Sequence, residues 1–535
     1  MMKKFKDPLY GYIEITDEIV CNIIDTAEFQ RLRFIIQTSY APLYPSAVHN
    51  RFVHSLGVYH LSRIVSDSFQ KFIDNNRDFD IYARYIDVFQ YASLLHDIGH
   101  APFSHTGEDF YLGLDSSRDS LHGTIAGLIQ DESFLSDISA KNYGAAPHEL
   151  MSVVVSLRAF NSIFDNDEEK SFFARCILGY PYVDNINEKR TFLNCMISML
   201  NSSVIDIDKL DYLIRDAYIT GFDTVSIDYH RLLNNVSIQY ENNKCRIVYT
   251  NGAISVIEGV VFAHDVERKW IQSHPVVLYD SYLLRQAIER LQKELEIFDY
   301  EALTVAGKNL CNGRHISLLS DGDIIFLMKE MINDPYIKEY FTRKDRRHPL
   351  WKSEAEYKAI FGKVLNDNSY KKFEDEIEGL LKYLNTVTRS YEINKDAISA
   401  IENDISETEQ IEAQVDTRKD SIRKQLEAKR RHLKWLNCFR QFAESQDLEL
   451  DFLFIQSNQF NSGFRKVAFD NIEVLFSSLQ KPDKFKNVTT TLSANKSERD
   501  TFYYLFYRRN GREKTVDVTA LAKGIAKLTN DEAFE

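Results

Sequence analysis

The 535-residue chain contains few of the residues that interrupt regular structure. It has only 20 glycines and 10 prolines, roughly half of their usual combined share. This scarcity favours long regular elements and predicts a mainly helical protein. Aromatic residues make up 13% and apolar residues 44% of the chain, which excludes a largely disordered protein. At about 100–200 residues per domain, two to four domains are expected.

Paired cysteines, long apolar runs and net positive charge are also missing. The six cysteines are scattered without a CxxC pair, which excludes a thiolate zinc knuckle and a disulfide scaffold and predicts a reducing, cytoplasmic environment. No stretch approaches the roughly 20 apolar residues of a membrane span. The N-terminus has lysines but no apolar core, so we expect no signal peptide. The formal net charge of −14 disfavours nonspecific binding to DNA or anionic lipid.

Changes in residue pattern divide the chain into four segments. Apolar residues at helical spacing predict a string of helices in residues 1–290, with one small hairpin around the Asn-Gly pair of CRIVYTNGAISV. Residues 291–365 are mixed and read as a helical connecting region. Residues 366–446 are strongly charged and predict a long helix or a helical hairpin. Residues 447–535 alternate like strands and predict a small strand-rich lobe with a closing helix around VTALAKGIAKL.

Histidines crowd into two short runs that carry the clearest chemical signal. HNRFVHS supplies His49 and His54, and HDIGHAPFSH supplies His96, His100 and His105. Imidazole beside carboxylate is the ligand set of Mn, Fe, Ni, Co or Zn, and a shell of carboxylates and water also admits Mg. The pattern predicts a divalent metal site, in which Mn or Mg is expected to support activity in an assay.

The adjacent pair His96-Asp97 predicts where that site lies on its helix. Neighbouring residues on a continuous helix point about 100° apart, so both can reach one metal only where the helix ends. Gly99, followed by Ala101 and Pro102, predicts that end.

Several motifs in a fixed order carry a family resemblance. IDTAEFQRLRFIIQ, YPSAVHNRFVHSLGV, LLHDIGHAPFSHTGE, HELMS and IDIDKLDYLIRD follow one another. This set resembles the HD-domain deoxynucleoside triphosphate triphosphohydrolases, which include bacterial dGTPases and the human SAM-and-HD-domain restriction factor. The similarity covers most of residues 20–290, and no SAM-like domain is expected before it. We therefore expect a mainly α fold, with a helical HD-domain catalytic core, a long charged helical segment and a small α+β C-terminal lobe.

The resemblance implies which residues hold the metal. The matching positions are His54, His96, Asp97 and Asp208. Asp206 is the alternative fourth ligand, and we favour Asp208 because it directly precedes the Lys209 of the family pattern. Asp206 and Asp211 are otherwise expected on a solvated helix face.

The resemblance also assigns the substrate contacts, which fall on Gln37, Arg51, His100, Lys209, Tyr212 and Asp216. The cationic side chains of Arg51 and Lys209 are expected to contact the triphosphate. His100 and His105 are expected to lie at the α-phosphate. Gln37, Tyr212 and Asp216 are expected to bind the sugar. Their amide, phenol and carboxylate can together hydrogen-bond a 3′-hydroxyl, while an aromatic ring packed under C2′ excludes a 2′-hydroxyl. After Gln37 the chain reads TSYAPLYPS, where relatives often have a Gly-rich turn and one more residue.

For proton transfer the resemblance implies His105 paired with Glu108, which would keep the imidazole protonated. A second catalytic histidine usually follows in an HE-containing segment. His148, in PHELMS, fits best and implies an insertion across roughly 110–145, whereas His122, in SLHGTIAGLI, is the competing choice.

The activity that the resemblance implies is metal-dependent hydrolysis of a dNTP to a deoxynucleoside and inorganic tripolyphosphate. The alternatives are another HD phosphohydrolase, such as a nucleotidase or phosphodiesterase, and a nucleotide sensor without turnover. Family members commonly form homo-oligomers and are activated by nucleotides at subunit interfaces. A basic cluster at Arg343, Lys344, Arg346 and Arg347 is either such an anion site or a solvated face.

Overall fold

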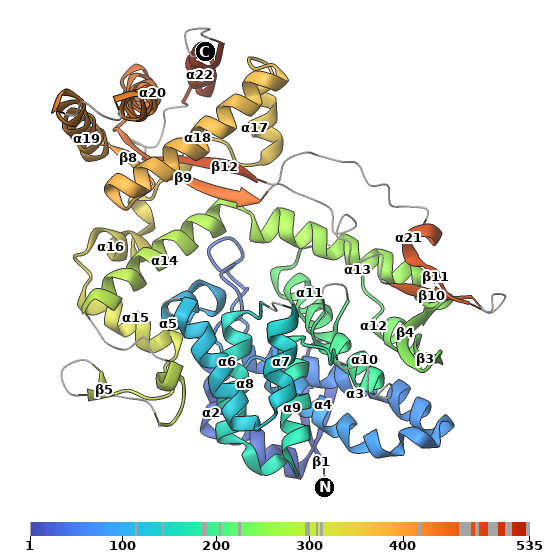
Figure 1. Cartoon of the computed structure of the whole chain (residues 1–535). Coiled ribbons are helices and arrows are strands. Elements are labelled where there is room, and N and C mark those ends of the chain that lie inside the picture. Colours follow the sequence, from blue (N-terminus) through green and yellow to red (C-terminus); the bar gives the residue numbers. More distant parts are fainter. Residues whose placement is uncertain are drawn as a thin grey trace. The chain divides into compact units, whose positions relative to one another are not determined.

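The computed structural model describes residues 2–112, 115–141, 144–183, 190–202, 205–222, 226–294, 300–306, 309–310, 314–414, 419–458, 472–476, 481–489, 501–508 and 516–530. Most of these residues lie in helices, so the prediction of a mainly α protein with a few small sheets is confirmed (Figure 1). Among them, no helix is both long and apolar enough to cross a membrane. The chain divides into two compact units, which we describe separately.

The first unit comprises residues Met1–Gln272, Asp280–Ile337 and Asn461–Lys496. Its helices up to the middle of the chain are α1 (Asp17–Ile19), α2 (Ala27–Arg31), α3 (Arg51–Asn75), α4 (Ala83–Leu95), α5 (Asp109–Leu112), α6 (Asp115–Ile129), α7 (Glu132–Lys141), α8 (Pro147–Ala159), α9 (Asp167–Leu178), α10 (Arg190–Leu200), α11 (Ile207–Thr220), α12 (Tyr229–Asn234) and α13 (Ile254–Glu267). Two later helices are α15 (Asp321–Glu330) and α21 (Phe485–Val488), while α14 (Pro275–Glu294) and α16 (Pro335–Phe341) each have residues in both units.

Helix α3 is the centre of the first unit. It begins at Arg51 because the side chain of Asn50 accepts the N–H of Val53 at 3.2 Å. It packs against α4 and α11, and most of its first four turns are buried. A Cβ at Gly57 would lie 1.9 Å from the Asp211 carboxylate of α11, so glycine is what allows these two helices to approach so closely.

Small antiparallel sheets lie at the edges of the first unit. Their strands are β1 (Met2–Asp7) with β2 (Gly11–Thr16), β3 (Val236–Glu241) with β4 (Lys244–Thr250), β5 (Asn309–Leu310) with β6 (Arg314–His315), and β10 (Glu473–Leu475) with β11 (Asp483–Lys484). Strand β10 also pairs in parallel with β4, so a strand from the C-terminal segment completes this sheet.

The hairpin predicted around the Asn-Gly pair is wrong: CRIVYT forms β4, which pairs with the preceding strand β3, whereas the residues after Gly252 are helical. The chain reverses at Asn242 and Asn243, whose φ angles of 53° and 61° are left-handed. Asparagine tolerates that region because its short polar side chain bonds locally. The Asn251-Gly252 pair instead opens a 3₁₀ turn that leads into α13.

The second unit is built on a four-stranded sheet in the order β7-β12-β9-β8. Its elements are β7 (His348–Pro349), α17 (Glu354–Phe361), α18 (Asp367–Thr388), β8 (Glu392–Asn394), α19 (Lys395–Gln414), α20 (Lys419–Ser445), β9 (Asp451–Asn458), β12 (Thr501–Tyr507) and α22 (Val518–Asn530). In its described residues, the segment predicted as a long helix or a helical hairpin contains the helices α18, α19 and α20, of which α19 and α20 pack on each other. Of the stretch RKVAFDNIEVLF, residues 465–471 lie outside the described residues.

One member of the basic cluster is neither a free anion ligand nor part of a solvated face. Arg347 is buried, and its guanidinium lies 3.1 Å from Glu392 and 2.6 Å from Asp451. These two carboxylates already occupy the guanidinium, because a buried cation requires such partners. Arg343 and Lys344 are exposed.

Candidate active site

Four side chains from three helices meet at the centre of the first unit. His54 comes from α3, His96 and Asp97 follow the last residue of α4, and Asp208 lies in the first turn of α11. The His54 Nε2 atom lies 3.0 Å from Asp208 Oδ1, 3.2 Å from His96 Nε2 and 3.4 Å from Asp97 Oδ2. Helix α4 ends at Leu95, as the sequence predicts, and this end lets both His96 and Asp97 face the same point.

The donor atoms of this cluster fit a divalent cation. His54 Nδ1 bonds Asp211 and His96 Nδ1 bonds the Ser93 carbonyl, so the Nε2 atoms of the two rings face each other and are the atoms available to a metal. Carboxylate oxygens of Asp97 and Asp208 face the same point. A cation with ligands at about 2.1 Å separates neighbouring ligand atoms by about 3 Å, which matches the spacing here.

Electrostatics support the same interpretation. Burial alone would lower the pKa of His54, but hydrogen bonds to Asp208 and Asp211 raise it to about 10. The cluster therefore takes up positive charge, in this case a proton, at the point where its donors converge. A bound metal would displace that proton, so the metal affinity should increase with pH.

Asp211 is the outer partner that orients the His54 ring. Its carboxylate is fully buried and accepts from His54 Nδ1 at 2.7 Å. Arg215 donates two further hydrogen bonds to it at 2.9 and 3.0 Å, and the Tyr10 hydroxyl donates at 2.7 Å. The Arg215 guanidinium also bonds Asp7. The expected solvated helix face at Asp206 and Asp211 is therefore wrong, since both are buried with charged partners.

We expect the substitution Asp211→Asn to weaken Mn²⁺ binding by about 10–100-fold, because outer hydrogen-bond partners fix the orientation and basicity of a histidine ligand. Isothermal titration of the apoprotein with Mn²⁺ measures this change. The matched control is Asp228→Asn, which alters an exposed helix-capping aspartate. An unchanged Mn²⁺ affinity in a folded Asp211→Asn protein would show that Asp211 does not support the metal site.

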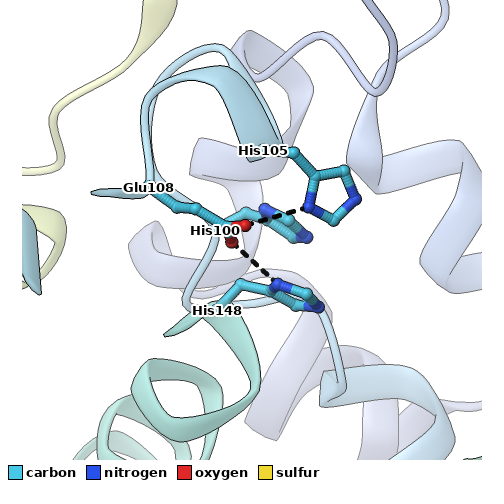
Figure 2. Close-up of side chains that lie close together, drawn as sticks. All are labelled: His100, His105, Glu108 and His148. Atoms are coloured by element: carbon cyan, nitrogen blue, oxygen red, sulfur yellow. Dashed lines mark hydrogen bonds and ion pairs between the residues drawn. The ribbon is translucent and has the colours of Figure 1, made fainter. Parts of the chain in front are cut away.

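A second cluster contains three histidines around one carboxylate. Glu108 accepts from His105 Nδ1 at 3.2 Å and from His148 Nδ1 at 2.8 Å (Figure 2). His100 stacks on His148 with ring centroids 4.1 Å apart, and its Nε2 lies 3.2 Å from Asp97 Oδ1. His100 thus joins this cluster to the metal cluster.

The two histidines that donate to Glu108 differ in exposure and in the length of that hydrogen bond. The His105 side chain is 63% exposed, and its Nδ1 lies 3.2 Å from Glu108. Burial alone would lower the pKa of His148, but its 2.8 Å hydrogen bond to Glu108 outweighs burial and raises that pKa. The shorter hydrogen bond favours His148 as the protonated partner, whereas the family resemblance implied His105.

The two candidates for the second histidine lie in different surroundings. His148 is in the first turn of α8, which begins at Pro147 and brings the imidazole to Glu108. His122 lies on α6, where its Nε2 bonds the Tyr180 hydroxyl at 3.2 Å. Of the two, only His148 belongs to the cluster of Figure 2.

The two expected phosphate-binding cations already hold the site together. Arg51 bonds Asp97 through Nη1 at 2.7 Å, Ser104 Oγ through Nε at 3.0 Å and the Gln37 carbonyl through Nη2 at 3.2 Å. Lys209 donates to Asp206 and to the Ser202 carbonyl. A guanidinium has five N–H donors and an ammonium three, so both retain donors for phosphate oxygens.

The expected sugar-binding residues lie on two neighbouring segments. Asp216 is buried on α11 and bonds His49 Nε2 at 2.7 Å, while the backbone N–H of Gln37 donates to the His49 carbonyl at 3.0 Å. Within the described part of the chain the buried Gln37 Oε1 has no hydrogen-bond partner. Tyr212, half-buried, precedes Asp216 on α11 by one turn.

Sequence reasoning assigned no role to Glu267, the last residue of α13. It is buried and accepts from Tyr40 at 3.2 Å and from Gln272 at 2.9 Å. Burial and the nearby Asp216 raise the pKa of Glu267 well above its usual value. Glu267 therefore adds a second buried carboxyl group to the Asp216 end of the site, and no local motif indicated it.

Comparisons with known proteins find similarity in the region that carries this site. A profile of the HD domain matches residues 51–139. The deoxynucleoside triphosphate triphosphohydrolase SAMHD1 of Xenopus laevis is 32% identical over 369 residues, which cover 65% of this chain and 55% of that protein. The uncharacterized protein YwfO of Bacillus subtilis is 29% identical over 297 residues, covering 54% of this chain and 56% of its own length. The matches thus span little more than half of these relatives.

A solved structure shares the fold over nearly the whole chain. A hypothetical protein from Aquifex aeolicus superimposes with a TM-score of 0.56 at 20% identity, covering 98% of this chain and all of that one. At this identity the similarity concerns the fold alone.

Proposed function

The chain belongs to the HD-domain phosphohydrolase family, and from this premise we propose that it hydrolyses deoxynucleoside triphosphates at the α-phosphorus. The products would be a deoxynucleoside and inorganic tripolyphosphate. The observation that carries the proposal is the contact of His100 with both clusters: it touches Asp97 of the metal cluster and stacks on His148 of the proton-transfer cluster. A phosphorus atom bound between the two clusters would be within reach of both the metal and the proton donor.

The four residues His54, His96, Asp97 and Asp208 would hold the divalent cation, with Mn or Mg expected in an assay. When bound, the cation would polarise the phosphate and lower the pKa of water. Arg51 and Lys209 would use their remaining N–H donors to bind and orient the triphosphate. Gln37, Tyr212 and Asp216 would receive the deoxyribose.

His148 would supply the proton that the leaving group needs. As a water oxygen bonds to the α-phosphorus, the bond from phosphorus to O5′ breaks and O5′ takes a proton. Glu108 holds that proton on His148 in the ground state through the 2.8 Å hydrogen bond. His105, exposed over 63% of its side chain, would face the α-phosphate and donate a hydrogen bond to it.

Nucleotide activation, assembly into a homo-oligomer and a cytoplasmic location complete the proposal. They rest on the family resemblance and on the scattered cysteines. Activation is tested by supplying nucleotides in pairs, because a second nucleotide that accelerates turnover of the first must act at another site.

The proposal predicts tripolyphosphate as the inorganic product. The protein is incubated with Mn²⁺ or Mg²⁺ and each dNTP and rNTP, singly and in pairs, and the products are separated by ion chromatography. The blank carries His96→Ala and Asp97→Ala together. Tripolyphosphate from dNTPs and not from the blank is the expected result. Orthophosphate or pyrophosphate would assign the protein to another HD phosphohydrolase reaction, and binding without turnover would make it a nucleotide sensor.

A further inference from the structure

A buried carboxylate outside the HD motifs bonds two separate segments of the site. Asp321 is the first residue of α15 and is only 4% exposed. Its Oδ1 accepts the backbone N–H of Phe103 at 2.7 Å, and its Oδ2 accepts the backbone N–H of Ile36 at 2.8 Å. Both N–H groups are thereby satisfied by one side chain that lies more than 200 residues away in sequence.

Each of these amides belongs to a segment that carries functional residues. Ile36 directly precedes Gln37, and Phe103 lies two residues before His105. The hydroxyl of Ser104 joins the same two segments, since it donates to the Ile36 carbonyl at 2.6 Å and accepts from Arg51 Nε at 3.0 Å.

The segment around Phe103 needs such support because its backbone is strained. Phe103 and Ser104 have φ angles of 61° and 51°, a left-handed region that non-glycine residues adopt only at an energetic cost. Strained backbone persists where surrounding contacts determine it. The Asp321 bond to the Phe103 N–H is one such contact.

The charge state of Asp321 suits this role. Burial raises the pKa of Asp321 to about 6, while the two N–H groups and the nearby guanidiniums of Arg31 and Arg51 oppose that shift. At neutral pH the group is therefore a carboxylate, and both oxygens are acceptors. Arg31 also bonds the same loop, donating to the carbonyls of Ile98 at 3.3 Å and His100 at 2.5 Å.

We propose that Asp321 is a positioning residue that holds the Gln37 segment and the His100–His105 loop in the relative placement required for turnover. The inference rests on the proposed function for its effect on rate, but not for its effect on structure. Among the described residues, the hydrogen bonds of Asp321 go to the backbone N–H groups of Ile36 and Phe103 and not to the expected metal or phosphate ligands, so it acts through the two backbone segments.

The test is Asp321→Asn in the full-length protein. Asparagine keeps one acceptor oxygen but turns an NH₂ group toward the second backbone N–H, so one of the two bonds is lost. We expect kcat to fall by about 100-fold, which is the effect of a misplacement of about 1 Å. We also expect amide hydrogen exchange to become about tenfold faster in peptides covering residues 35–38 and 100–108. Mn²⁺ affinity, measured by titration calorimetry, should stay unchanged.

The matched control is Asp323→Asn on the same helix. Asp323 accepts from the backbone N–H and the hydroxyl of Ser320, in the cap of α15. This variant should retain wild-type kcat and wild-type exchange in both peptides. Equal effects of the two substitutions would mean that Asp321 merely stabilises α15, which would overturn the proposal.

A second variant decides the question if Asp321→Asn does not fold. Asp321→Glu keeps the charge but moves the carboxylate by one methylene group, so a lowered kcat and faster exchange in both peptides are still expected. Wild-type kcat and exchange in Asp321→Glu would overturn the proposal. If the wild-type protein itself hydrolyses no dNTP, the proposed function fails, yet the exchange measurements still test the positioning role.

Discussion

Replacing Asp208 by alanine is expected to reduce kcat for dNTP hydrolysis by at least about 10³-fold, the loss of roughly 4 kcal/mol of transition-state stabilisation by the metal. Asp208 Oδ1 lies 3.0 Å from His54 Nε2 and 3.5 Å from His96 Nε2, so it completes the donor set. Its side chain is 37% exposed, and its removal leaves no buried cavity. Among the four expected ligands it can therefore be removed with the least effect on folding.

Two measurements separate this effect from a structural one. Mn²⁺ affinity should fall together with kcat, while the melting temperature of the apoprotein should change by no more than about 3 °C. Asp167→Ala is the control, because Asp167 is an exposed acidic residue in the first turn of α9 that pairs with Lys170. Retained Mn²⁺ affinity in the Asp208→Ala protein would show that Asp208 is not a metal ligand, and would favour Asp206 as the fourth ligand.

The second large effect is expected from Glu108→Gln, which should lower kcat by about 10²–10³-fold. The carboxylate raises the pKa of His148, and the neutral amide would not. The reaction needs the imidazolium, which exists below the pKa of His148. Loss of the carboxylate lowers that pKa, so the alkaline limb of the pH–kcat profile should move to lower pH. Profiles measured from pH 5 to 10 with saturating substrate test this shift.

A double-mutant cycle distinguishes this role from a role in substrate binding. If Glu108 acts through His148, the double variant with Glu108→Gln and His148→Gln should be no slower than His148→Gln alone. Fully additive losses would show that the two residues act independently. An alkaline limb that stays in place in Glu108→Gln would show that His148 is not the proton donor.

Local signals in the sequence predict much of the site. The helix ends just before His96-Asp97 because Gly99 and Pro102 follow within six residues, and the structure ends α4 at Leu95. The first turn of α11 is capped by Asp206, so the motif that contains Asp208 is also a helix start. Such features depend on neighbours in the chain, and they can be read without the fold.

What the sequence could not provide depends on contacts between distant segments. The burial of Asp211 requires Tyr10 and Arg215, and the position of Asp321 requires backbone N–H groups more than 200 residues away. The residue pattern of a single helix does not distinguish a buried aspartate with such partners from a solvent-exposed one. The shorter distance from Glu108 to His148 than to His105 is likewise set only by the folded chain.

Hydrolysis in ¹⁸O-labelled water tests the central claim most directly, because the label identifies the phosphorus that water attacks. The wild-type protein is incubated with Mn²⁺ and a dNTP in H₂¹⁸O, and the products are analysed by mass spectrometry. The account predicts one ¹⁸O atom in the tripolyphosphate and none in the deoxynucleoside, since the bond between the α-phosphorus and O5′ breaks. Label in orthophosphate, in pyrophosphate or in the deoxynucleoside would contradict it.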